Sequence, residues 1–148
     1  MEFEVIDELT PELCQSIEKL EKSVFPNTYR PGRFTEEAPS KPGLLGLILK
    51  NESGEMMAYK IGYQLKTNTF YSWVGGVHPE YRGKGIANKL MVEQHKLLRE
   101  LKYKYVRTKT RMSFRLMLIT NLKHGFDITG LSYKSSISGL VIQMEKSL

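Results

Sequence analysis

The chain has 148 residues, of which 41% are hydrophobic and 26% are charged, as expected for a soluble globular protein that forms one domain over residues 1–148. The longest apolar run, residues 44–49, is interrupted by Gly46 and is too short to span a membrane. The formal net charge of +6 favours a polyanionic ligand.

The sequence predicts neither a disulfide nor a metal site. Cys14 is the single cysteine, so an internal disulfide is excluded, and no spacing of His, Cys, Asp or Glu predicts a metal site. The acidic first residues do not resemble a secretory signal. We therefore expect a cytoplasmic location, with Cys14 as a small buried hydrophobe.

Hydrophobic periodicity and turn residues predict an alternation of helices and strands. The predicted strands span residues 3–6, 43–50, 56–66, 70–77, 105–110, 126–134 and 137–145. The predicted helices span residues 11–25, 86–101 and 114–123, with a short helix around Glu36 in an irregular segment. Thr10 and Pro11 are typical of a helix start.

The helical spacing also predicts which side chains face the core. The longest helix should bury Ile86, Leu90, Leu97 and Leu101, with Met91 and Leu98 beside them. The last helix should bury Phe114, Met117, Leu118 and Leu122. His95 and His124 are expected on helix surfaces.

Residues 77–87, VHPEYRGKGIA, predict an anion site between a strand and a helix. Backbone N–H groups at a helix start are unpaired and lie at the positive end of the helix dipole, and glycines let such a backbone close around phosphate. The Walker pattern is absent, and the dinucleotide pattern fails because Asn88 occupies its third glycine position. A tight turn that uses glycine only for geometry is the alternative.

Two motifs resemble the GNAT superfamily of acetyl-CoA-dependent N-acetyltransferases. Arg82-x-x-Gly85-x-Ala87 is similar to the loop that holds the acetyl-CoA pyrophosphate in that superfamily. Residues 117–127 are similar to its second signature, in which a helix ends in Y/N-x-x-x-G-F, here Asn121 to Phe126. The element order also matches, so the resemblance covers nearly the whole chain.

The resemblance implies an α+β fold with a mixed, mostly antiparallel sheet of about seven strands flanked by about four helices. In this fold the sheet is splayed between the fourth and fifth strands, and the pantetheine arm of acetyl-CoA lies in the opening. Gly75 and Gly76 fit that place, because paired glycines in a strand mark a bulge or a close approach.

The resemblance also implies a set of site residues. The residues expected to bind acetyl-CoA are Gly75, Gly76, Val77, Arg82, Gly83, Lys84, Gly85, Ile86, Ala87, Asn88 and Asn121. Asn121 stands where many relatives have a tyrosine that protonates the departing thiolate, so it is expected only to contact the thiol or the pantetheine. The residues expected to contact the acceptor are Tyr29, Arg30, Phe34 and Tyr63.

The implied reaction is direct transfer of an acetyl group from acetyl-CoA to a primary amine of a small molecule or a protein. No decisive general base is visible, so positioning and water are expected to dominate. A non-catalytic acyl-CoA sensor on the same fold and a basic nucleic-acid-binding domain are the alternatives. The nucleic-acid alternative rests on the charge of residues 82–124, which contain twelve Lys or Arg and only two Glu. The sequence does not decide the oligomeric state, although the last two predicted strands could form a homodimer interface.

Overall fold

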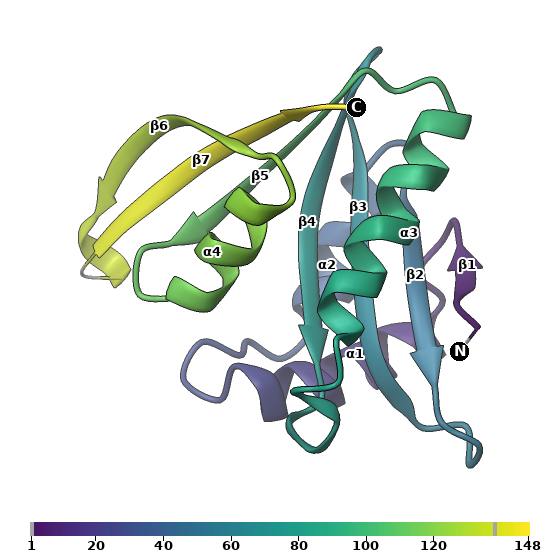
Figure 1. The fold of residues 1–148 in the computed structure, drawn as a ribbon. Helices are drawn as coiled ribbons and strands as arrows, with labels where there is room; N and C mark the ends of the chain where they lie inside the picture. The colour runs from purple at the N-terminus through teal and green to yellow at the C-terminus, as the bar shows by residue number, and fades with distance from the viewer. Residues whose placement is uncertain (1, 138) are drawn as a thin grey trace.

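The computed structural model describes residues 2–137 and 139–148 of the chain as one sheet with helices on both faces (Figure 1). The strands are β1 (Glu4–Ile6), β2 (Leu45–Lys50), β3 (Met56–Lys66), β4 (Thr69–Val77), β5 (Tyr105–Arg111), β6 (Asp127–Lys134) and β7 (Gly139–Ser147). The helices are α1 (Pro11–Val24), α2 (Arg33–Glu37), α3 (Ile86–Glu100) and α4 (Arg115–Lys123). Short 3-10 turns lie at Ala38–Ser40, Pro79–Tyr81 and Ser135–Ile137.

The sheet order is β1-β2-β3-β4-β5-β7-β6, and β4 and β5 are its parallel pair. Each of the other neighbouring pairs is antiparallel. The predicted α+β fold with a mixed, mostly antiparallel sheet is therefore confirmed. In the described part of the chain, no helix is both long enough and apolar enough to cross a bilayer.

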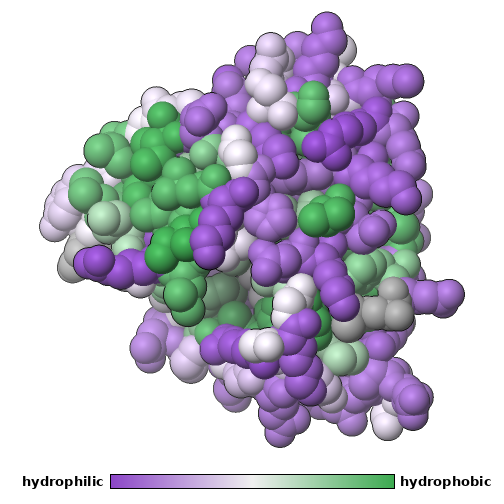
Figure 2. All heavy atoms as spheres, viewed as in Figure 1, coloured by the Kyte–Doolittle hydropathy of each residue, from purple (hydrophilic) through white to green (hydrophobic). Residues whose placement is uncertain are grey.

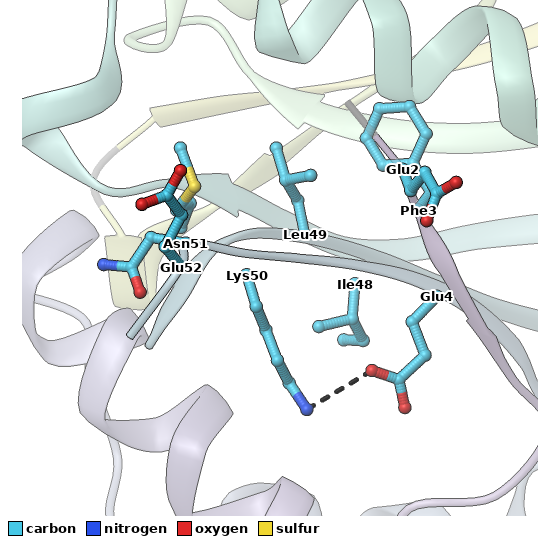
Figure 3. A pocket seen from close by; sticks show the side chains of 9 residues that line it. Glu2, Phe3, Glu4, Ile48, Leu49, Lys50, Asn51 and Glu52 are labelled. Carbon is cyan, nitrogen blue, oxygen red and sulfur yellow. Dashed lines mark ion pairs between the residues drawn. The ribbon is translucent and has the colours of Figure 1, made fainter. Parts of the chain in front are cut away.

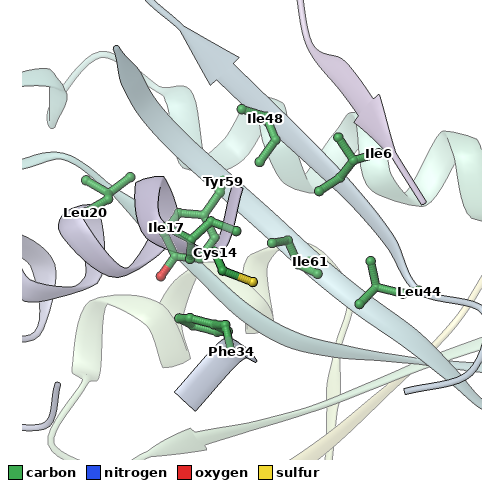
Figure 4. Close-up of a cluster of buried hydrophobic side chains, with 9 residues drawn as sticks. All are labelled: Ile6, Cys14, Ile17, Leu20, Phe34, Leu44, Ile48, Tyr59 and Ile61. Carbon is green, nitrogen blue, oxygen red and sulfur yellow. The ribbon is translucent and has the colours of Figure 1, made fainter. Parts of the chain in front are cut away.

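Helix α1 starts where the sequence predicts, because the Thr10 side chain caps it. Thr10 Oγ1 accepts a hydrogen bond from the backbone N–H of Leu13 at 3.2 Å, and Pro11 occupies the first turn. The helix packs Cys14 and Ile17 onto the sheet beside Tyr59 of β3 (Figure 4). The expectation that Cys14 is a buried hydrophobe is thus confirmed.

Helix α3 covers the opposite face of the sheet (Figure 1) and corrects two predictions about its surface. Leu101 lies just beyond the helix end and is 52% exposed, so it is not a core residue. His95 is 2% exposed, so its prediction as a surface residue is wrong. The spacing offered a signal, because Met91 and Leu98, at i−4 and i+3 from His95, are core residues.

Helix α4 reverses the predicted burial of its side chains. Phe114, Met117 and Leu122, predicted to be core residues, are between 37% and 45% exposed, whereas Asn121 is 4% exposed. The reason is the side on which the helix packs, since Asn121 faces Met144 of β7. The apolar residues on the other sides of α4 are consequently left without cover.

Gly62 of β3 provides a test of the packing between the sheet strands. A Cβ atom there would lie 2.2 Å from the carbonyl oxygen of Tyr71 and 2.3 Å from Cε1 of Phe70. We predict that Gly62→Ala lowers the free energy of unfolding by at least about 2 kcal/mol, because neither backbone nor a buried ring yields cheaply. Urea unfolding measures this loss. Gly130→Ala is the control, because Gly130 has no left-handed backbone and its Cβ would meet only the movable end of the Gln143 side chain, at 2.9 Å. An equal loss in both variants would contradict the packing.

Candidate functional site

The opening between β4 and β5 is the main irregularity of the sheet. The two strands pair only at Thr69–Tyr71 of β4 and Tyr105–Arg107 of β5. Where they part, Thr108 Oγ1 donates a hydrogen bond to the carbonyl oxygen of Ser72 at 3.1 Å. Beyond that point β4 continues along β3 and β5 continues along β7, and Figure 1 shows the two strands diverging. The splayed sheet predicted from the sequence is confirmed.

The open edge of β4 presents backbone groups of Gly75 and Val77 to this gap. The N–H of His78 donates to the carbonyl oxygen of Met57 at 2.8 Å. This bond shows which residues of β4 direct their backbone N–H and C=O groups toward β3. Because alternate residues of an antiparallel strand face its partner, the N–H groups of Val77 and Gly75 point away from β3. Arg82 Nε reaches the Val77 carbonyl from the open side at 3.3 Å.

The bulge of β4 lies at Trp73, two residues before the glycine pair where the sequence placed it. Ile61 pairs with Val74 and Gly62 with Ser72, so Trp73 is the extra residue. Gly75 and Gly76 pair regularly with β3, and Gly76 lets a side chain of β3 lie close to the backbone of β4. A Cβ atom on Gly76 would lie 3.3 Å from the Tyr59 hydroxyl, so the absence of a side chain lets that hydroxyl approach the β4 backbone.

The loop after β4 forms the expected turn into α3. Gly83 and Gly85 both have φ of +76°, a conformation that favours glycine, and Gly85 caps α3 without a side chain. The N–H groups of the first helical turn therefore remain available to a ligand. Arg82 and Lys84 flank them, and Lys84 Nζ lies 5.5 Å from the Tyr81 ring centre. The short 3-10 turn Pro79–Tyr81 connects the open edge of β4 to this loop.

Polar groups on the α3 side of the sheet lack partners within the chain. Gln94, His95 and Thr110 each have a buried side-chain nitrogen or oxygen with no hydrogen bond among the described residues. Such atoms are costly to bury, so a ligand with amide groups that entered this side would suit them. These orphaned atoms, together with the open edge of β4, are consistent with the amide-bearing arm of acetyl-CoA.

The same side is strongly basic. Burial lowers the pKa of His95 to about 3, with Lys146 and Lys60 contributing, and Lys146 Nζ lies 3.1 Å from His95 Nδ1. Burial also lowers the pKa of Lys60 to about 8. Nearby, His124 Nε2 lies 2.9 Å from Asn88 Oδ1 and links the end of α4 to the start of α3. The field here favours an anion, as the charge of residues 82–124 suggested.

Asn121 lies in the core beneath α4. Its Nδ2 donates to the sulfur of Met144 at 3.6 Å, and its backbone carbonyl accepts from the N–H groups of His124 and Phe126. The side chain thus fixes the helix to β7, and the backbone carbonyl closes the turn at Gly125, whose φ is +90°. Its expected contact with a thiol stays a prediction.

The residues expected to contact the acceptor are only partly brought together. Tyr63 joins Tyr71 and Trp73, with ring centres 5.4 and 6.0 Å away, in a half-buried aromatic face beside the opening of the sheet. Phe34 is only 1% exposed and packs behind Trp73, so it is not part of the exposed face, and its expected contact with an acceptor stays a prediction. Arg33 belongs to this face instead, 5.6 Å from the Trp73 ring centre.

Two further acceptor candidates lie in the segment between α1 and α2. Tyr29 is half-buried, and its N–H donates to the carbonyl oxygen of Phe25 at 2.9 Å. Arg30 forms ion pairs with Glu36 at 2.7 Å and Glu37 at 3.4 Å, so its charge is compensated within the chain. Their roles toward an acceptor remain predictions.

Glu21 of α1 is a candidate that the sequence reasoning missed. It is 6% exposed and accepts a hydrogen bond from the Tyr59 hydroxyl, the group that approaches Gly76. Burial raises the pKa of Glu21 to about 7, with Arg33 acting in the opposite sense. A signal was present, since Glu21 lies at helical spacing from the buried Cys14 and Ile17.

A surface hollow of about 700 Å³ lies away from these groups at the β1–β2 edge (Figure 3). It is lined by residues such as Phe3 and Leu49, and an ion pair between Lys50 and Glu4 at 3.2 Å crosses it. It contains none of the predicted site residues. In the described part of the chain, no cluster of His, Cys, Asp and Glu is suited to a metal ion.

Comparisons with known proteins agree with the fold. The family model described as acetyltransferase (GNAT) family matches residues 14–126. An aminoglycoside 6'-N-acetyltransferase complexed with coenzyme A has a TM-score of 0.80 at 15% identity, covering 99% of this chain and 97% of its own. The ribosomal-protein-S18-alanine N-acetyltransferase from Escherichia coli has a TM-score of 0.79 at 15% identity, with coverages of 99% and 94%. Ard1 from Thermoplasma volcanium has a TM-score of 0.76 at 19% identity, with coverages of 100% and 99%.

At these identities the solved structures establish the fold alone, and no curated protein matches the chain. The family match covers most of the chain and decides the class. The protein is an acyltransferase that uses acetyl-CoA. It belongs to the acetyltransferase (GNAT) family.

The raised pKa of Glu21 predicts a pH dependence of stability. The folded chain holds this proton up to a pH of about 7, whereas the unfolded chain releases it near 4.5. Its stabilising contribution is complete below the lower value and is lost as the pH rises through the higher one. Between pH of about 5 and about 8, we expect the free energy of unfolding to fall by up to about 3 kcal/mol on this account.

Urea unfolding of the wild type and of Glu21→Gln at both pH values measures this contribution. The glutamine keeps a neutral hydrogen-bonding group and cannot ionise, so its stability should fall less over this range. His95, whose pKa is lowered in the folded chain, also makes stability depend on pH. Its contribution is the same in the wild type and in Glu21→Gln, so it cancels when their free energies of unfolding are subtracted. Parallel pH dependences of the two proteins would exclude a buried, titrating Glu21.

Proposed function

We propose that the protein is an N-acetyltransferase that transfers the acetyl group of acetyl-CoA to a primary amine by direct attack. The observation that carries this proposal is the pair of open sets of backbone N–H groups, one at Gly75 and Val77 on the edge of β4 and one in the loop and first turn of α3. Two such sets suit an extended ligand with amides at one end and phosphates at the other. The coenzyme A bound to the structurally similar aminoglycoside enzyme supports the same ligand class.

In this proposal the two ends of acetyl-CoA are held by different groups of the chain. The pyrophosphate lies against the loop N–H groups and the side chains of Arg82 and Lys84. The residues that form this cradle are Arg82, Gly83, Lys84, Gly85, Ile86, Ala87 and Asn88. The pantetheine pairs with the open edge at Gly75, Gly76 and Val77, which brings the thioester into the gap of the sheet.

The chemistry follows from the groups around Gly75. Its free N–H is placed to polarise the thioester carbonyl as negative charge develops on the oxygen. The amine nitrogen forms a bond to the carbonyl carbon, the carbon–sulfur bond breaks, and the thiolate leaves as a group with a pKa near 8.5. Water, rather than Asn121, protonates the thiolate, because an amide is no acid.

Glu21 is the proposed acceptor for the proton that the amine loses. Its carboxylate is reached through the Tyr59 hydroxyl, which lies behind Gly76 on the α1 side of the sheet. A carboxyl group with a pKa of about 7 exchanges protons readily near neutral pH. This replaces the expectation that water alone carries the proton.

The acceptor is proposed to lie against the aromatic face of Tyr63, Tyr71 and Trp73. Lys41 Nζ lies 4.8 Å from the Tyr63 ring centre and 5.2 Å from that of Trp73, and no ion pair to Lys41 is present in the described part of the chain. A cation there favours an acceptor that carries a carboxylate or phosphate beside its amine. Thiol release with amines that have and lack such a group tests this, and faster turnover of polyamines would contradict it.

The loop assignment predicts a loss of ligand affinity in Gly85→Ala. A Cβ atom at Gly85 strains a backbone with φ of +76° and enters the proposed phosphate cradle, so acetyl-CoA affinity should fall at least about tenfold. Gly54→Ala is a matched control, since Gly54 has φ of +82° and equally open surroundings. Titration calorimetry compares them, and an equal or absent loss in both variants would contradict the cradle.

The role of Glu21 predicts a change in the pH profile of the enzyme. With the wild type, kcat/KM should rise through a pKa near 7, and Glu21→Gln should lower kcat by about 10²-fold and remove this limb. Glu12→Gln, in the exposed first turn of α1, is the control. An unchanged profile in Glu21→Gln would show that the group acts only in folding.

A further inference from the structure

Strand β6 forms an edge of the sheet that carries apolar side chains. It is the last strand in the sheet order, with β7 as its neighbour. Ile128, Leu131 and Tyr133 are 51%, 63% and 67% exposed. An edge with large apolar side chains is a ready partner for another strand, and natural monomers usually protect such edges.

These side chains lie on the same face of the sheet as the uncovered side of α4. Ile128 pairs with Met144 of β7, whose sulfur contacts α4, and Leu131 pairs with Ile142 of the same buried cluster. On α4 itself, Leu116 is 82% exposed and Ile119 is 46% exposed. Figure 2 shows the resulting apolar area over the lobe of α4 and β6. A contiguous apolar patch of this kind marks an interaction site.

The sequence of β6, DITGLSYK, is complementary to itself when it is read in the opposite direction. A bulge places Thr129 and Gly130 together opposite one position, so the strand has a symmetric pattern around Leu131. Antiparallel pairing of two such strands opposes Asp127 to Lys134 at both ends. Each apolar residue then meets an apolar residue, and the charges pair on the opposite face.

We propose that a second copy of this chain docks here, with the two β6 strands pairing antiparallel about a two-fold axis through Leu131. Across the axis, Leu131 meets its own equivalent, Ile128 meets Tyr133 and Asp127 meets Lys134. Both α4 helices then lie on one face of a continuous sheet, on either side of the apolar side chains that the two β6 strands bring together. The pattern fits a second copy because the same strand supplies both halves of each pair.

The bulge in β6 places its apolar side chains on one face of the strand and its charged side chains on the other. Without an extra residue between Ile128 and Leu131, these two side chains would point to opposite faces of β6. With it, Ile128, Leu131 and Tyr133 share the α4 face, while Asp127 and Lys134 share the other face with Ser132. The paired strands therefore join apolar to apolar and charge to opposite charge without a change of register.

Sedimentation equilibrium of the full chain tests this dimer with a charge exchange. The wild type should be a dimer, whereas Asp127→Lys and Lys134→Asp, each of which opposes like charges twice, should raise the dissociation constant at least about tenfold. The double variant Asp127→Lys/Lys134→Asp should dimerise again, and so should an equimolar mixture of the two single variants. Recovery of this kind would not follow from a general loss of folding.

Leu131→Lys provides a second test, because it places two ammonium groups on the axis and should give a monomer. Val5→Lys on β1, the opposite edge strand, is the matched control, since Val5 is 54% exposed and lies outside the interface. Circular dichroism and acetyl-CoA binding verify that each variant is folded. A monomeric wild type, or a dimer that persists unchanged in Leu131→Lys and in both single charge variants, would overturn the proposal.

Discussion

The parting of β4 from β5 is the constraint on which the site depends. Backbone N–H and C=O groups inside a sheet are normally paired, and leaving them open is unfavourable unless water or a ligand satisfies them. Here each strand keeps a full partner on its outer side, β3 for β4 and β7 for β5. The three-residue parallel pairing and the hydrogen bond from Thr108 to Ser72 hold the strands only at one end. The gap is thus built into the sheet.

The two faces of the sheet give this gap two different environments. On the α3 side, the glycine loop, Lys60 and Lys146 surround it with positive charge and partnerless polar atoms, which suits an anionic donor. On the α1 side, Glu21 and Tyr59 lie behind Gly76, and the aromatic face of Trp73 lies beside them. A donor from one side and an acceptor from the other would meet at the backbone of Gly75. This separation explains why the sheet, rather than a closed pocket, is the centre of the site.

Much of this arrangement could be predicted from the sequence because its signals are local. Thr10 and Pro11 cap α1 as expected, and the ends of β3 agree with the predicted residues 56–66. The glycines at 83 and 85 need a left-handed backbone, which is a property of the residue itself. The fold class and the family followed from the same local patterns.

The errors arose where tertiary packing decides burial. His95 and Glu21 are polar residues on apolar helix faces; His95 was predicted on the surface because it is polar, and Glu21 was assigned no role. In α4 the buried amide of Asn121 takes the place of an apolar contact and leaves Met117 and Leu122 exposed, which the helical period could not show. The position of the bulge at Trp73 depends on the register between β3 and β4, which the sequence does not show. The bulge was therefore predicted at the glycine pair, where glycine offered a local signal. None of these corrections changes the fold class or the family.

Amide hydrogen exchange at Gly75 and Val77 tests the central claim most directly. Residue-resolved NMR exchange rates would be compared with and without acetyl-CoA, and Gly76 provides an internal control because its N–H faces β3. We expect Gly75 and Val77 to exchange fast in the free protein and to become protected on binding, while Gly76 is protected in both states. Acetyl-CoA binding that leaves the exchange at Gly75 and Val77 unchanged would contradict the role assigned to the open edge of β4.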